Sequence, residues 1–169
     1  MRPLAVLPLA LLVAACDQID RATGSPPHVS TPGSRADATV TRVVDGDTIH
    51  VLLDGAETTI RFIGVDTPET VAPGQPIECY GPEASRFAMA RLTGGAVELE
   101  FDRDLIDPYD RTLAYVWLDG RLFDETLVRR GFAEAKAYPP NTAHQAQLDA
   151  AESSARASGR GLWGACAHA

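Results

Sequence analysis

A small β-barrel with helices packed outside it is the fold class that the sequence predicts, and a five-stranded OB-fold with about three α-helices fits best. Two observations lead to this prediction. From Ala38 onward, short apolar and alternating runs rich in β-branched residues follow one another, separated by Asp-Gly turns. Segments with helical spacing then lie between and after the later strands.

The expected strands are short and end at turn residues. They span residues 38–44, 48–53, 58–65, 97–101 and 112–118. Asp45-Gly46 and Asp54-Gly55 are the turn dipeptides between the first three. A two-residue hairpin at Asp54-Gly55 places Thr48 opposite Arg61 on the neighbouring strand.

The expected helices are bounded by residues that commonly begin or end helices. The first opens at Gly81-Pro82 and stops at Gly94-Gly95. The second runs over residues 122–130 and is closed by Gly131. The third begins at a capping box over residues 142–145, in which Thr142 caps the helix, and it runs to Gly159.

The composition fits one globular domain and excludes a simple basic nucleic-acid-binding protein. The chain has 169 residues, of which 45% are hydrophobic, and a formal net charge of −8. A protein that binds polyanions through a general positive field would have the opposite sign. Any anionic substrate must therefore be bound by a local cationic cluster or by a bound metal ion.

The residues before the predicted barrel have the composition of an export signal and a tether. A short cationic start precedes the apolar residues 4–15, which are too few to span a bilayer. The ending Val13-Ala14-Ala15-Cys16 resembles the lipobox of bacterial lipoproteins, in which the cysteine is acylated; a plain signal peptide cut nearby is the alternative. The predicted organisation is a signal peptide (1–15), a lipidated Cys16 with a flexible tether (16–37), a domain (38–166) and a C-terminal tail (167–169).

This organisation predicts an extracytoplasmic protein anchored to a membrane through its lipid. If Cys16 is acylated, Cys79 and Cys166 are the remaining thiols. Exported proteins tend to pair their cysteines, so a Cys79–Cys166 disulfide is expected, which would pin the tail to the barrel.

Charged residues concentrate in three segments, at residues 45–48, 61–69 and 107–111. An arginine can bind a phosphate through two parallel hydrogen bonds, and carboxylate oxygens bind hard divalent cations. In the expected hairpin register, however, Asp66 lies beyond Asp47 by roughly 13 Å along a straight strand. The two carboxylates meet only if the barrel curls strongly or the chain bends at Gly46.

Each segment also has a simpler interpretation. Residues 61–69 can be read as a strand with a charged end and a turn. The turn at Asp45-Gly46 is common turn chemistry, and a loop arginine such as Arg111 beside aspartates usually forms a solvated ion pair. The sharper hypothesis is that Arg111 and Arg61 bind the same phosphate.

Several separate motifs, in order and spacing, resemble the staphylococcal nuclease (thermonuclease) family. They are Asp45-Gly46-Asp47-Thr48, Arg61, Val65-Asp66-Thr67-Pro68-Glu69, residues 80–85, Tyr109, residues 111–115, Leu127-Val128-Arg129, Gly131, Pro140-Asn141-Thr142, His144 and Leu162-Trp163. The resemblance covers roughly residues 38–166, nearly the whole predicted domain.

The resemblance implies an OB-fold nuclease that uses one calcium ion and cleaves DNA and RNA to leave 3′-phosphate ends. It implies that Asp47 and Asp66 are carboxylate metal ligands and that Thr67 is a ligand through its backbone carbonyl. Glu69 would position or deprotonate the attacking water, and Arg61 and Arg111 would bind the phosphate. We expect the protein to act as a monomer.

Two departures from the family pattern concern substrate contacts. Asp110 stands where the family usually has glycine, and Pro108 stands where the best-known member has lysine. Tyr109 is a candidate for a phosphate hydrogen bond, and Tyr138 is a candidate for contacting a base.

A catalytically silent OB-fold module that binds single-stranded nucleic acid is the alternative function. The acidic and arginine residues favour the enzyme, because a protein that only binds needs no metal carboxylates. A structural envelope lipoprotein would explain the signal and tether but not the charged segments. The histidines show no zinc-motif spacing.

Overall fold

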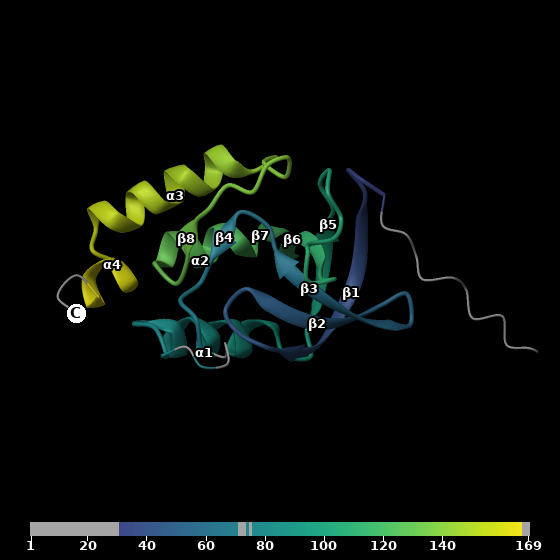
Figure 1. The fold of residues 1–169 in the computed structure, drawn as a ribbon, viewed down its shortest axis with the longest axis horizontal. Coiled ribbons are helices and arrows are strands. Elements are labelled where there is room, and N and C mark those ends of the chain that lie inside the picture. Colours follow the sequence, from purple (N-terminus) through teal and green to yellow (C-terminus); the bar gives the residue numbers. More distant parts are fainter. Residues whose placement is uncertain (1–30, 71–73, 75, 167–169) are drawn as a thin grey trace, which may run out of the picture.

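The computed structural model describes residues 31–70, 74 and 76–166, shown in colour in Figure 1. The predicted signal peptide, Cys16, most of the predicted tether and the tail at 167–169 lie outside the described residues. The elements, in chain order, are β1 (Arg35–Val43), β2 (Thr48–Leu53), β3 (Ala56–Phe62), β4 (Val65–Asp66), α1 (Gly81–Leu92), β5 (Ala96–Glu100), β6 (Thr112–Leu118), β7 (Arg121–Leu122), α2 (Phe123–Arg130), β8 (Glu134–Ala135), α3 (Gln145–Ala157) and α4 (Leu162–Ala165).

Five strands close into the predicted barrel. The antiparallel order is β3-β2-β1-β5-β6, and a parallel pairing of β3 with β6, in which Ile60 lies opposite Thr112, closes the ring. The Thr48–Arg61 pairing is confirmed. The interior is filled by side chains that are almost fully buried, among them Ile49, Val51, Ile60, Phe62, Leu99 and Val116.

The first strand starts earlier than expected. Arg35 to Asp37, which the sequence placed in the tether, pair with Glu98 to Glu100 of β5. The guanidinium of Arg35 forms ion pairs with Glu98 and Glu100 and lies 4.4 Å from the ring centroid of Trp117. These contacts depend on residues far along the chain, so the polar composition of the segment did not reveal them.

The expected third strand is broken into two. β3 ends at Phe62, Gly64 adopts a φ of +77°, and the chain resumes as β4. β4 pairs with β8 instead of continuing the barrel, with Asp66 opposite Glu134. The glycine is required here because a Cβ would lie 2.4 Å from the Leu148 side chain.

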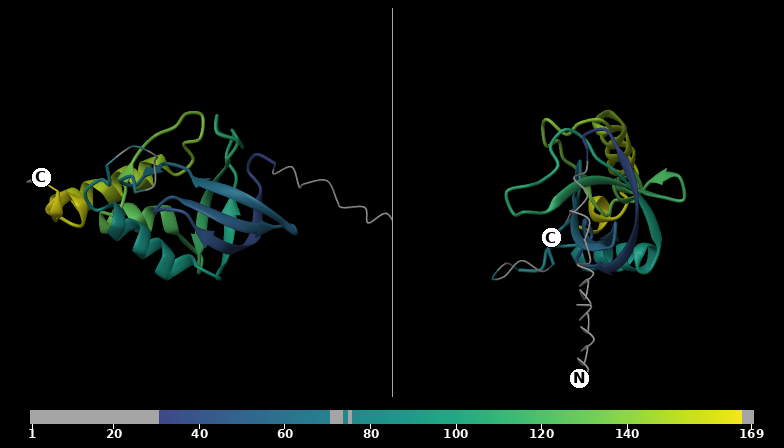
Figure 2. Two further views of the ribbon diagram at one scale, coloured as in Figure 1. Left: turned by 60° about the horizontal axis from the view of Figure 1, so that its bottom comes forward. Right: turned by 90° about the vertical axis from the view of Figure 1, so that its right-hand side faces the viewer.

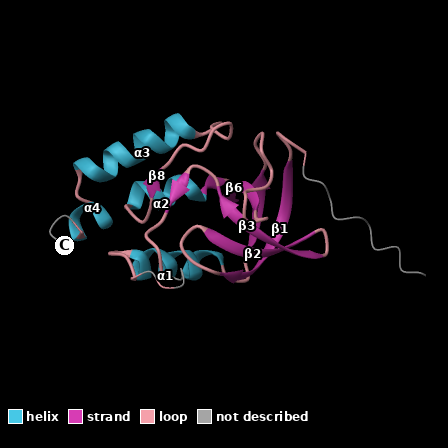
Figure 3. Ribbon diagram, in the orientation of Figure 1, coloured by secondary structure: helices cyan, strands magenta, loops and turns pink. Residues whose placement is uncertain are grey.

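The helices lie at one end of the molecule and the barrel strands at the other (Figures 2 and 3). The first two helices match their predicted bounds closely, while α4 and the two-residue strands were not expected. None of the helices in the described part of the chain is long and apolar enough to cross a membrane.

The predicted capping box is wrong. α3 starts at Gln145 and has no side-chain cap. Tertiary partners take its place: the N–H of Ala143 donates to the Asp102 carboxylate (3.0 Å), and the N–H of His144 donates to the Tyr115 hydroxyl (3.4 Å). The Gln145 side chain bonds forward to Asp149 instead of back to Thr142.

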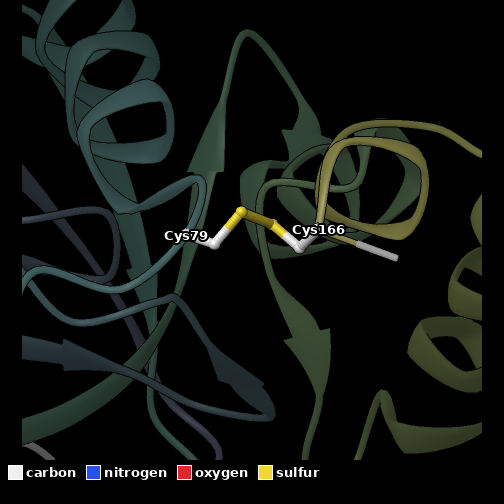
Figure 4. Close-up of a disulfide and its surroundings, with 2 residues drawn as sticks. All are labelled: Cys79 and Cys166. Atoms are coloured by element: carbon white, nitrogen blue, oxygen red, sulfur yellow. A yellow bond between two sulfur atoms is a disulfide. The ribbon is translucent and has the colours of Figure 1, made fainter. Parts of the chain in front are cut away.

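Cys79 and Cys166 form a disulfide in the structure, with their Cα atoms 5.9 Å apart. Figure 4 shows the bond joining the segment before α1 to the residue that follows α4. The loop it closes spans 87 residues. Restricting an unfolded chain over that length contributes about 4–5 kcal/mol to stability in the chain-entropy account.

Candidate active site

Arg61, near the end of β3, is the centre of the charged cluster. Its side chain is only 11% exposed, and it forms ion pairs with both predicted metal-ligand carboxylates: Nε lies 3.3 Å from Asp47, and Nη2 lies 3.1 Å from Asp66. Nη1 donates to the backbone carbonyls of Phe62 (2.8 Å) and Val65 (2.9 Å). The chain bend after β3 therefore wraps around the guanidinium.

This bend helps to explain how Asp66 approaches Asp47, although the hairpin register separates the two carboxylates along a straight strand. We expected barrel curl or a bend at Gly46 to bring Asp47 and Asp66 together. In the structure the barrel closes through β3 and β6, and the chain also turns at Gly64, where φ is +77°. Gly46 has a different role, because a Cβ there would lie 2.7 Å from the Thr67 side chain. It lets the turn before β2 pack against the segment after β4.

Thr67 fixes the orientation of Asp47. Its backbone N–H (2.8 Å) and its hydroxyl (2.9 Å) both donate to Oδ2 of Asp47, which is almost fully buried. The neighbouring Asp45 accepts the N–H of Asp47 at 3.0 Å. Burial and the charge of Asp47 raise the pKa of Asp45 to about 6. Negative charge is therefore crowded in this turn, which favours binding of a cation.

Arg111 approaches the same region from the loop before β6. Its Nε and Nη2 both lie 2.7 Å from Oδ2 of Asp107. The other oxygen, Oδ1, accepts the backbone N–H groups of Tyr109 and Arg111, each at 2.9 Å. Burial opposes ionisation of Asp107, but these donors together lower its pKa. Asp107 thus stays ionised and holds both the loop and the arginine.

The departure at Asp110 has a structural explanation. Asp110 adopts a φ of +63°, the left-handed conformation that glycine reaches without strain and that aspartate tolerates better than most residues. The loop therefore keeps its turn without glycine. Tyr109 is 81% exposed, and its ring centroid lies 5.4 Å from the Arg111 guanidinium.

One polar hollow of about 260 Å³ collects most of the predicted site residues. It is lined by Asp45, Asp47, Arg61, Asp66, Thr67, Pro68, Glu69, Arg111 and Tyr138. Tyr109 lines an adjoining, more apolar hollow of about 310 Å³ that shares Arg61, Arg111 and Tyr138 with the first. Pro108 and Ile106 also line this second hollow. Every predicted catalytic, metal and substrate residue thus lines one or both of these two hollows, which together are called the cleft.

Lys136 contacts two residues of the cleft, and sequence reasoning missed it. Its Nζ lies 2.6 Å from Oδ2 of Asp66 and 5.7 Å from the ring centroid of Tyr138. The hydrogen bond to Asp66 raises the pKa of the lysine. Its position follows from the β4–β8 pairing and from its N–H bond to Gly64 O (2.9 Å), which no local pattern indicates.

Asp124, in α2, is a buried carboxyl that the sequence did not single out. Its side chain is fully buried; Oδ2 accepts the N–H of Val116 at 2.9 Å, and Oδ1 has no hydrogen-bond partner in the described part of the chain. Burial raises the pKa of Asp124 to about 8.

Stability is therefore expected to fall as the pH rises from about 4 to about 8, because the unfolded chain ionises Asp124 while the folded protein keeps it protonated. The maximum slope for one group is about 1.4 kcal/mol per pH unit. Asp124→Asn should remove most of this dependence. Urea unfolding across this pH range, in a chelator, measures it; equal slopes for the two proteins would contradict the assignment.

The closed barrel and the cleft of carboxylates and arginines define an OB-fold protein suited to binding phosphate esters. The family model described as "Staphylococcal nuclease homologue" matches residues 59–165. The chain is 48% identical over 124 residues to the thermonuclease of Staphylococcus hyicus, covering 73% of each protein. It is 37% identical over 149 residues to endonuclease YncB of Bacillus subtilis (strain 168), covering 87% of this chain and 70% of that protein. The chain belongs to the staphylococcal nuclease family, and the predicted resemblance is confirmed.

Proposed function

We propose that this protein is a calcium-dependent nuclease that hydrolyses phosphodiester bonds of DNA and RNA without sequence preference and leaves 3′-phosphate ends. Family membership makes it a phosphodiester hydrolase. The single observation that carries the finer proposal is the cleft in which Arg61, Arg111 and Glu69 line the same polar hollow as Asp47 and Asp66.

The donor set in this hollow fits calcium. Calcium prefers several oxygen ligands, including carboxylates and backbone carbonyls, in a flexible arrangement. Asp47 and Asp66 supply two carboxylates to the lining of the hollow, and Thr67 lines it as well. No ready-made group of three or more acidic, histidine or cysteine side chains is found among residues 31–70, 74 and 76–166.

Side chains of the protein carry out the other steps: they bind the phosphate, activate the water and hold Arg111 in place. Arg61 and Arg111 bind the phosphate oxygens and stabilise the negative charge that develops on them. Glu69 orients the attacking water and accepts its proton as the new P–O bond forms; the P–O5′ bond breaks, and the leaving O5′ takes up a proton from solvent water. Calcium, when bound, supplies further charge neutralisation on the phosphate. Asp107 keeps the Arg111 guanidinium in place through its two short contacts.

The adjoining hollow suits a nucleoside. It combines the exposed ring of Tyr109, the ring of Tyr138 and apolar side chains such as Leu113 next to both arginines. Bases of any identity stack on aromatic rings, so such a surface supports binding without sequence preference. Lys136, beside Tyr138, adds a cation on this side of the cleft, which otherwise has Pro108 where the best-known relative has lysine.

The test is hydrolysis of single- and double-stranded DNA and of RNA by the purified protein, with calcium and with a chelator. Cleavage should require calcium and release 3′-phosphate ends. Binding of nucleic acid without cleavage in any metal would favour the silent single-strand-binding module instead.

Asp47→Asn is expected to weaken calcium binding by about tenfold or more, since ligand shells are sensitive to loss of a single group. The amide keeps the shape of the side chain but removes its charge. Titration calorimetry with calcium measures this effect without reference to activity. Asp37→Asn, the same change on an exposed part of β1, is the matched control and should bind calcium like the parent. Equal affinities for all three proteins would remove Asp47 from the metal site.

We also propose that the protein is a membrane-anchored lipoprotein acylated on Cys16, outside the described residues. Its support is the apolar segment 4–15 with small residues before the cysteine. Mass spectrometry of the membrane fraction should find a diacyl or triacyl addition on Cys16. An unmodified soluble protein with another N-terminus would contradict the proposal.

A further inference from the structure

Glu69, the proposed group that handles water, sits on a segment braced by residues just before α1. The N–H of Glu69 donates to Oε2 of Glu78, and the N–H of Glu78 donates to the carbonyl of Glu69, both at 2.9 Å. Gly81 packs so closely that a Cβ there would lie 2.9 Å from the carbonyl oxygen of Pro68. The backbone position of Glu69 thus depends on the position of residues 78–81.

Little hydrophobic burial holds residues 77–79, which directly precede Tyr80 and α1. Glu78 and Cys79 are exposed, and Ile77 is 66% exposed. Hydrogen bonds between exposed groups compete with water and hold a segment only weakly. The next residue, Tyr80, stacks on Phe132 with ring centroids 5.6 Å apart, which secures the start of α1 but not the residues before it.

The Cys79–Cys166 disulfide attaches residues 77–79 covalently to the residue that follows α4. Cys166 directly follows α4, and that helix is fixed to the residue after α2 by the hydrogen bond from the Leu162 N–H to the Gly131 carbonyl oxygen at 2.9 Å. Figure 4 shows the bond crossing from the segment before α1 to α4. Cys79 is exposed and Cys166 is partly exposed, so a reductant in solution can reach the bond.

We propose that the Cys79–Cys166 disulfide is a positioning device for Glu69 and makes turnover sensitive to thiol reductants. The inference rests on the proposed function of Glu69. It assigns the bond a role in catalysis beyond general stability. With the bond intact, residues 78–81 hold the Glu69 backbone; without it, residues 76–79 move and Glu69 loses its fixed distance to the water.

Dithiothreitol provides the chemistry for the test. Its thiolate attacks one sulfur of the disulfide and forms a mixed disulfide with one cysteine, releasing the other; its second thiolate then attacks its own sulfur in that mixed disulfide and releases the remaining cysteine. Two electrons and two protons pass to Cys79 and Cys166, which become thiols, while the reagent is oxidised to its cyclic disulfide. Thiol titration verifies that the bond has been reduced.

Reduction should lower kcat by about tenfold, since small displacements of a catalytic group have effects of that order or larger. The KM should change by less than about threefold, because Arg61 and Arg111, which bind the phosphate, lie on other segments. Cys79→Ser/Cys166→Ser should reproduce the low kcat and show no response to dithiothreitol. In a Glu69→Gln background, losing the bond should cause no further decrease, because coupled residues are not additive.

Hydrogen exchange supplies a readout independent of activity. The amides of Glu69 and Glu78 should exchange faster after reduction, while the amide of Val51 in the barrel should keep its protection. An unchanged kcat in the verified dithiol form, full additivity with Glu69→Gln, or loss of protection throughout the barrel would each overturn the inference. If the oxidised protein cleaves no nucleic acid, the proposed function fails, whereas the exchange result still decides whether the bond holds Glu69.

Discussion

Arg111→Lys is expected to lower the turnover of DNA by on the order of 10²-fold or more, the scale of removing one preorganised electrostatic group. In the structure the Arg111 guanidinium is held by Asp107 and lines both hollows of the cleft. A lysine keeps the charge but presents a single ammonium group, which cannot reproduce a planar contact with two phosphate oxygens.

The same substitution should leave stability almost unchanged. The Arg111–Asp107 ion pair is partly exposed, at 31% for the arginine, and such pairs contribute about 1 kcal/mol or less. Calcium-dependent hydrolysis and a thermal melt of each protein give the two numbers. Arg42→Lys is the matched control, because Arg42 is exposed on β1 and contacts His50 away from the cleft. A fully active Arg111→Lys protein would mean that the catalytic cleft lies elsewhere in the chain.

The barrel was predictable because its signals are local. Alternating apolar residues set the bounds of β2 and β6, and the Asp54-Gly55 turn set the register that pairs Thr48 with Arg61. Gly131 ended α2 as expected, with a φ of +75°. In these segments the local preference and the tertiary structure agree.

The failures all lie where long-range contacts override local preference. The apolar run through Val65 looked like one strand, but the Leu148 side chain requires a glycine bend at Gly64. The capping motif at Thr142 was replaced by contacts to Asp102 and Tyr115, which are distant in the sequence. Two-residue strands such as β4 carry no periodicity, so a sequence pattern cannot reveal them.

The candidate site shows the same division. The residue types of the site could be predicted from the motifs, because carboxylates bind metal ions and arginines bind phosphates. Their geometry was not predictable, since Asp66 comes to the same arginine as Asp47 after a bend at Gly64 that no motif indicated. Lys136 follows β8 and contacts Asp66, and Asp124 lies in α2 and accepts the N–H of Val116. No sequence motif connects either residue to the cleft.

Arg61→Lys is expected to differ from Arg111→Lys by damaging both activity and stability. Arg61 is 11% exposed and makes contacts to two carboxylates and two backbone carbonyls. A lysine cannot reach this set, because its one ammonium group lacks the forked donors of a guanidinium. Activity should fall on the order of 10²–10³-fold, since the phosphate contact is lost and the metal carboxylates lose their common partner.

The stability loss should be about 2–4 kcal/mol, because the carbonyls of Phe62 and Val65 lose their donors and Asp47 is left buried without its ion pair. Urea unfolding in a chelator measures this term in the absence of metal, with Arg111→Lys as the comparison. Calcium should restore part of the lost stability by binding the freed carboxylates. If Arg61→Lys unfolds like the parent protein, the bend after β3 does not depend on the guanidinium, and Gly64 and the β4–β8 pairing alone bring Asp66 to Asp47.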